Sequence, residues 1–133
     1  MPERDFKYWR QIFLWILFIS SNGTVSPCVY LNLSIDGIIP RIFCGTEIKV
    51  PQLSFGNINS QDLIEIWDNR EYKEFRKNYV RRAEVLAKAY KNIDFDLFGT
   101  MDRMKKAERE VEKGLKVLPL PSSCRTCCKA YGI

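Results

Sequence analysis

Three hydrophobic patterns follow one another along the chain. The first is a continuous apolar run at residues 12–19, rich in aromatic and β-branched side chains, which leads to Asn22-Gly23, a dipeptide typical of two-residue hairpin turns. Apolar residues resume beyond this turn at Val25, so the run predicts a buried strand and a β-hairpin. From Val29 to Gln52 the chain stays apolar but is interrupted by proline and glycine, which indicates short strands and loops.

The remainder of the chain has the period of helices. Asn59 or Ser60 is expected to cap a short helix, and Asp68-Asn69 is expected to bend the chain before a longer one. The apolar side of the short helix consists of Leu63, Ile64, Ile66 and Trp67. The buried face of the longer helix consists of Tyr72, Phe75, Tyr79, Ala83, Leu86 and Tyr90.

A last helix is expected after a break near residues 92–99, with Thr100 as its cap. Its inner face is predicted to carry Met101, Met104, Ala107, Val111 and Leu115. Methionines at this spacing are more often core residues than parts of a cofactor site. Pro119 and Pro121 then end the helix and lead to the C-terminal cysteines.

These elements predict an α+β fold, in which a small N-terminal β-hairpin and a cysteine loop precede two or three helices and a cysteine-bearing tail. The length of 133 residues fits a single domain. Within residues 1–133 we expect an atypical N-terminal segment at 1–17, the hairpin and cysteine loop at 18–52, the helices at 53–118 and the cysteine tail at 119–133.

The apolar run at residues 12–19 has an alternative interpretation. Basic residues precede it and small residues follow it, as in a secretory signal peptide. Eight apolar residues are too few to span a bilayer, which takes about twenty. We favour the strand, because a hairpin explains both flanks of the run, and we expect a cytoplasmic protein with no membrane partner.

Composition and charge exclude several classes of function. Apolar residues make up 46% and charged residues 28% of the chain, as in ordinary globular domains. The sequence contains no histidine, which removes Ser-His-Asp and Cys-His catalysis, HExxH zinc sites and Cys2His2 fingers. The net charge of +5 is spread through acid-rich helices instead of forming a basic stripe, so we expect no nucleic-acid partner.

The five cysteines carry the candidate chemistry, and all lie outside the predicted helices. Cys124 and Cys127 form a Cys-x2-Cys pair, whose spacing lets two thiolates converge on a metal or cluster. Cys28 and Cys44, at the two ends of a loop, complete a set of four. The side chain of Cys128 is expected to point away from that of Cys127, because adjacent side chains diverge in an extended backbone. Spacing alone gives an iron–sulfur cluster and a structural zinc ion equal weight, with disulfides behind them because one cysteine would be left over.

Three segments in order resemble the SPASM domain, the C-terminal extension of many radical SAM enzymes. Asn22 to Cys28 resembles the family's motif, in which a strand leads to a glycine and a cysteine follows five positions after it. Cys124-x2-Cys127, followed by Lys129, Tyr131 and Gly132, resembles the family's closing cysteine pair. The helix segment of the family is similar to Phe55-Gly56-Asn57-Ile58, Leu63, Glu65-Ile66-Trp67, Tyr72 and Phe75-Arg76.

This resemblance implies an auxiliary 4Fe–4S cluster held by thiolates, with Cys28, Cys44, Cys124 and Cys127 as ligands. The chain departs from the family in one respect, because the usual cysteine upstream of the motif glycine would fall between Lys7 and Phe13 and is absent. Either Cys44 completes the set, or the true upstream ligand has been lost at an altered start. The alternative for the same four cysteines is a small interaction domain stabilised by a structural zinc ion.

The resemblance also implies a partner. A radical SAM barrel needs Cys-x3-Cys-x2-Cys and about two hundred residues, and this sequence has neither, so we expect it not to cleave SAM by itself. The barrel is expected in cis in a longer protein or in trans, and the chain is a fragment, half of a split enzyme or a free module. The substrates of the family imply a peptide, a protein side chain or a cofactor precursor. No catalytic residue is assigned.

Overall fold

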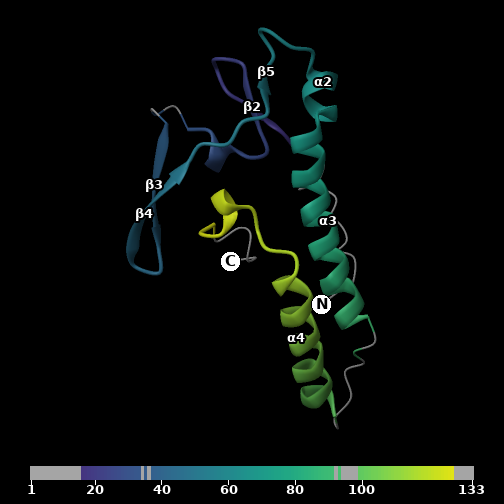
Figure 1. Ribbon diagram of the computed structural model, residues 1–133. Helices are drawn as coiled ribbons and strands as arrows, with labels where there is room; N and C mark the ends of the chain where they lie inside the picture. Colours follow the sequence, from purple (N-terminus) through teal and green to yellow (C-terminus); the bar gives the residue numbers. More distant parts are fainter. Residues whose placement is uncertain (1–15, 34, 36, 92, 94–98, 128–133) are drawn as a thin grey trace. The chain divides into compact units, whose positions relative to one another are not determined.

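The computed structural model describes residues 16–33, 35, 37–91, 93 and 99–127 (Figure 1). In this part of the chain, two small antiparallel sheets precede three α-helices, which confirms the predicted α+β fold. The chain divides into two compact units. The first consists of Met1–Phe75 with Leu120–Ile133, and the second is Arg76–Pro119. All the described cysteines therefore belong to the first unit.

The first sheet has the strand order β1-β2-β5, with β1 at Phe18–Ile19, β2 at Thr24–Ser26 and β5 at Gly56–Asn57. The predicted hairpin is confirmed, since β1 and β2 pair antiparallel. Four residues, Ser20 to Gly23, connect the two strands in place of the expected two-residue turn, and Gly23 N–H donates to the Ser20 carbonyl with Gly23 in the left-handed region at φ 84°.

The predicted buried strand at residues 12–19 is confirmed in part among the described residues, since Leu17 and Phe18 are half-buried and Leu17 packs against the core. Only Phe18 and Ile19 form a strand, and both Ile16 and Ile19 are exposed. Among the described strands, β1 lies at the edge of the sheet and pairs only with β2, so its two residues bury little surface. Residues 12–15 lie outside the described part of the chain.

The second sheet is a regular hairpin of β3 (Ile38–Phe43) and β4 (Thr46–Pro51), which run side by side in Figure 1. The sequence predicted short strands and loops here. Pro40 does not interrupt the pairing, because in a two-stranded sheet both strands are edges and one side of each needs no partner. Cys44 and Gly45 form the connecting turn, with φ 50° and 77°, as in a two-residue type I′ turn.

The core of the first unit gathers around Val25, Ile66 and Tyr72, all at most 1% exposed. Phe55 stacks on Tyr72 with ring centroids 4.4 Å apart. Trp67 meets Tyr72 edge to face at 5.3 Å, a favoured arrangement for aromatic rings. The aromatic segment that resembles the SPASM helix region thus forms the core beneath β2.

Helix α2 (Leu63–Asp68) begins one residue after Asp62, which caps it, instead of after the predicted Asn59 or Ser60. Asp62 and Glu65 form a capping box, so the first turn satisfies its own backbone donors. Ile66 is buried as predicted, but Ile64 is exposed. The predicted bend is confirmed at Asn69, whose side chain accepts a hydrogen bond from Tyr72 N–H at the start of the next helix.

Helix α3 spans Arg70–Tyr90 and helix α4 spans Thr100–Lys116. In the second unit, Gly114 of α4 lies against Val85 of α3, where a Cβ atom would be 2.6 Å from Val85 Cγ1. Gly99, and not Thr100, precedes the first turn of α4, and Met101 is exposed, contrary to the predicted inner face. Among the described residues, no helix is both long and apolar enough to cross a membrane.

Candidate functional site

Cys28 is positioned by the end of β2. Ser26 and Pro27 before it are buried, and Cys28 itself has extended backbone with φ −161° and ψ 160°. The Ser26 hydroxyl donates a hydrogen bond to the Cys28 carbonyl at 3.0 Å. The 3₁₀ turn η1 (Val29–Leu31) follows at once, so the thiol lies between the end of a strand and the start of a turn.

Gly23 allows the loop before β2 to dock against the segment around β5. The Asn22 carbonyl accepts hydrogen bonds from Asn57 Nδ2 at 3.0 Å and Asn59 Nδ2 at 2.9 Å. A Cβ atom at Gly23 would lie 2.6 Å from side-chain atoms of both asparagines, and the φ of 84° is one that L side chains rarely adopt. The glycine thereby fixes where β2 begins and, five residues later, where Cys28 lies.

The Cys-x2-Cys pair lies in a compact turn. The 3₁₀ turn η2 covers Ser122–Cys124, and Cys124 N–H donates to the Pro121 carbonyl at 2.8 Å. Cys127 N–H donates to the Cys124 carbonyl at 3.1 Å, which closes a further turn around the pair. Cys124 is buried and Cys127 is half-buried. Cys128 lies outside the described residues, so its predicted divergence stays a prediction.

Cys28 and Cys127 are close enough to interact electrostatically, although they are 99 positions apart. The pKa of the Cys28 thiol is raised, first by burial and further by the charge of Cys127. Hydrogen bonds from the Tyr30 and Leu31 backbone N–H groups act in the opposite direction, because they favour the thiolate. The structure therefore brings together two of the predicted ligands from opposite ends of the sequence.

Arg41 of β3 contacts both cysteine-bearing segments. Its guanidinium donates to the Tyr30 carbonyl at 3.2 Å and to the Ser123 carbonyl at 3.2 Å. A longer bond of 3.4 Å reaches the Thr126 hydroxyl. Arg41 was not among the predicted site residues. An isolated arginine in an irregular apolar segment carries no pattern, and its partners in the tail are more than 80 residues away.

Cys44 lies apart from this arrangement, at the exposed tip of the β3–β4 hairpin. It is the one residue other than glycine with a positive φ in the described part of the chain. Its place in the ligand set stays a prediction.

The donors that the described site offers are thiols, and thiolates bind both zinc and iron–sulfur clusters. Among the described residues, no three cysteine, aspartate or glutamate side chains are close enough to hold one metal ion. A zinc ion needs its sulfur ligands at about 2.3 Å from one centre. An iron–sulfur cluster offers several irons, so its thiolates surround a larger body, and hydrogen bonds to sulfur such as those at Cys28 tune it.

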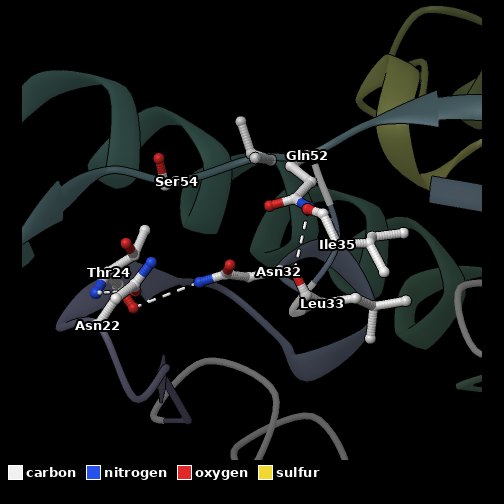
Figure 2. A pocket seen from close by; sticks show the side chains of 8 residues that line it. Asn22, Thr24, Asn32, Leu33, Ile35, Gln52 and Ser54 are labelled. Carbon is white, nitrogen blue, oxygen red and sulfur yellow. Dashed lines mark hydrogen bonds between the residues drawn. The ribbon is translucent and has the colours of Figure 1, made fainter. Parts of the chain in front are cut away.

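A polar pocket of about 210 Å³ lies beside the start of β2, where Asn22 and Thr24 line it (Figure 2). Asn32 Nδ2 donates to the Thr24 carbonyl at 3.3 Å, and Gln52 Nε2 donates to the Leu33 carbonyl at 3.0 Å. Its described lining consists of Asn22, Thr24, Asn32, Leu33, Ile35, Gln52, Leu53 and Ser54, which carry neither thiol nor charge. The pocket is therefore separate from the cysteine site.

Fold and site together define a small α+β domain in which Arg41 joins the segment of a strand-end cysteine to the turn of a C-terminal cysteine pair, an arrangement suited to a thiolate-bound metal cofactor. The family model of the SPASM domain, an iron–sulfur cluster-binding domain, matches residues 15–91, more than half of the chain. The chain belongs to the SPASM family. It is thus an iron–sulfur cluster-binding domain by family, and the predicted resemblance is confirmed.

The matched segment includes Cys28 and Cys44 and ends before Cys124 and Cys127. The link between the tail and the family motif therefore rests on the contacts of Arg41 and Cys127 described above. No curated protein and no solved structure matches the chain.

Proposed function

We propose that this chain is an auxiliary 4Fe–4S cluster domain of a radical SAM enzyme, with Cys28, Cys44, Cys124 and Cys127 as the cluster ligands. The observation that carries the proposal is the set of hydrogen bonds by which Arg41 joins the Cys28 segment, from the glycine–cysteine motif of the family, to the Cys124–Cys127 turn of the tail. When bound, such a cluster supplies a redox-active centre and iron sites that can ligate a substrate. The chain itself contributes no catalytic residue.

The role of the described residues is to hold thiolates and exclude water. Burial of Cys124 and partial burial of Cys28 and Cys127 keep solvent away from the sulfurs. The Tyr30 and Leu31 backbone N–H groups stabilise the Cys28 thiolate, which is the form that binds metal. Cys44 contributes less in this scheme, because its side chain is exposed at the hairpin tip.

We infer that the catalytic partner is a radical SAM barrel, in cis or in trans, because SPASM domains extend many radical SAM enzymes and the Cys-x3-Cys-x2-Cys motif of such a barrel is not in this sequence. The substrate class that we propose is a peptide, a protein side chain or a cofactor precursor. A reducing compartment such as the cytoplasm suits this role, since thiolate ligands must remain reduced.

The ligand assignment is tested by the iron and acid-labile sulfide content of anaerobically purified protein. We expect the unmodified chain to be brown, and Cys28→Ala, Cys124→Ala and Cys127→Ala each to lose most of the iron, because one lost thiolate opens the cluster to solvent. Ser122→Ala, an exposed change in the same turn as Cys124, is the matched control and should keep its iron. A colourless protein with one zinc ion per chain would contradict the proposal.

A further inference from the structure

Arg41 lies on the inward face of the β3–β4 hairpin. Side chains alternate between the two faces of a strand, and Arg41 shares its face with the buried Ile39. Its cross-strand partner is Ile48, two positions from the buried Val50. Ile42, on the opposite face, is 75% exposed. An arginine at an inward position is unusual, and its contacts explain why it is there.

The guanidinium joins two segments that are distant in sequence. One terminal nitrogen donates to the Ser123 carbonyl and the Thr126 hydroxyl, and the other donates to the Tyr30 carbonyl. Each of these acceptors lies within two residues of a described cysteine, because Tyr30 follows Cys28, Ser123 precedes Cys124, and Thr126 precedes Cys127. The planar fork of arginine suits such a multiple contact, whereas a lysine ammonium offers only a point charge.

Among the residues that the structure describes, the charge of Arg41 has no carboxylate partner. Within the described part of the chain, no ion pair involves Arg41. A guanidinium remains charged at every pH at which proteins fold, and cations held inside a protein are normally paired. The groups beside it that become anionic when they bind metal are the cysteine thiols, and the charge of Arg41 favours the thiolate of Cys28, although burial raises the pKa of this thiol.

We propose that Arg41 is the positioning and charge-compensating residue of the cluster site, holding the Cys28 segment against the Cys124–Cys127 turn and offsetting the negative charge of the ligated cluster. This inference rests on the proposed function, because the charge to be offset is that of bound thiolates. It adds to that function a residue that sets both cluster retention and cluster potential.

The charge of Arg41 should shift the reduction potential of the cluster in one direction. Transfer of one electron from dithionite to the cluster adds one negative charge to the site and requires no proton. A nearby cation stabilises that added charge, so Arg41 raises the reduction potential. Removing the positive charge should make the cluster harder to reduce.

The test uses the full chain, purified anaerobically, with iron and sulfide content and the midpoint potential of a dithionite titration as readouts. Arg41→Gln should hold less cluster, and the reduced-to-oxidised ratio of the remainder at a fixed potential should fall roughly tenfold, which is about 59 mV for one electron. Arg41→Lys keeps the charge and loses the fork, so it should hold less cluster at a potential close to that of the unmodified chain.

Lys49→Gln is the matched control, because it removes one positive charge from an exposed position of the same hairpin, opposite Pro40. It should change neither readout, since exposed charges are screened by water and salt. An equal shift in Lys49→Gln and Arg41→Gln would overturn the inference, as would an unchanged cluster content and potential in Arg41→Gln.

Two further outcomes keep the inference separate from the proposed function. If the unmodified chain holds no cluster, the proposed function fails and the inference fails with it. If the unmodified chain holds a cluster and Arg41→Gln loses it completely, the midpoint potential is measured on Arg41→Lys instead. If Arg41→Lys retains part of the cluster at the potential of the unmodified chain, the charge role of Arg41 is supported. A shifted potential in Arg41→Lys overturns that role.

Discussion

Cys28 and Cys44 were predicted as two ends of one ligand loop, but the structure places them in different surroundings. Cys28 follows a buried strand, receives backbone N–H groups at its sulfur and interacts with Cys127. Cys44 occupies the turn of a two-stranded hairpin and is exposed. Both cysteines lie near a glycine with positive φ, yet only Gly23 is enclosed by other residues. Packing around the backbone, and not the presence of a turn, is what places a thiol at a site.

The largest expected effect is on the free energy of unfolding, when a methyl group is added at Gly23 or at Gly45. Gly23→Ala should lower the free energy of unfolding by about 2–4 kcal/mol, since it combines the cost of a left-handed residue with overpacking against Asn57 and Asn59. Gly45→Ala has a similar φ and no atom within 4 Å of the added Cβ, so it should cost only about 1–2 kcal/mol. Urea denaturation of both variants measures the difference.

Iron content gives the same pair of glycine variants a second readout. Gly23→Ala should also hold less cluster, because it displaces the start of β2 and with it Cys28, whereas Gly45→Ala should hold nearly as much as the unmodified chain. Equal losses of iron in the two variants would show that the glycine before Cys28 and the glycine after Cys44 contribute equally to cluster binding, contrary to the difference in their packing.

A smaller effect is expected in the alkylation rates of the two thiols in the cluster-free protein. Cys44 is exposed and should react with iodoacetamide roughly tenfold faster near neutral pH than Cys28, which is half-buried and has a raised pKa. Because that pKa lies above the ordinary value of 9.0, the thiolate fraction of Cys28, and hence its rate, should still rise beyond pH 9. Mass spectrometry of the labelled peptides measures each rate.

Repeating the labelling on cluster-loaded protein sharpens the ligand assignment. Cys28 should become fully protected, since a ligated sulfur is no nucleophile, and Cys44 should be the least protected of the four predicted ligands. Modification of Cys44 at its cluster-free rate would assign the fourth position to a different group. A faster rate for Cys28 than for Cys44 in the cluster-free protein would contradict the surroundings described for both.

The features that could be predicted from the sequence are those determined by near neighbours. The Asn22-Gly23 turn, the bend at Asn69 and the helical period after Arg70 depend on residues within a few positions of each other. The helix starts were misplaced, because several polar residues in a row compete as caps and side-chain geometry selects Asp62.

The β3–β4 hairpin and Arg41 could not be predicted in the same way. The hairpin turns at Cys44, which is not a typical residue for positive φ, and it contains prolines that usually end strands. Arg41 donates hydrogen bonds to backbone carbonyls, and the positions of these carbonyls depend on the whole fold. Cysteine spacing and family motif identified the ligand candidates, but only the folded chain relates Cys28 to Cys127.

The smallest expected effect is that of Cys128→Ser, which should retain its iron, sulfide and visible spectrum, while Cys127→Ser loses all three. The turn closed by Cys127 N–H and the Cys124 carbonyl brings these two residues together, and neighbouring side chains diverge when the backbone is extended. The competing arrangement is a helical tail in which Cys124 and Cys128, four positions apart, face the cluster together. One cluster cannot use both arrangements, because either Cys127 or Cys128 must turn away. Loss of iron in Cys128→Ser with retention in Cys127→Ser would therefore show that the tail is helical beyond Cys124.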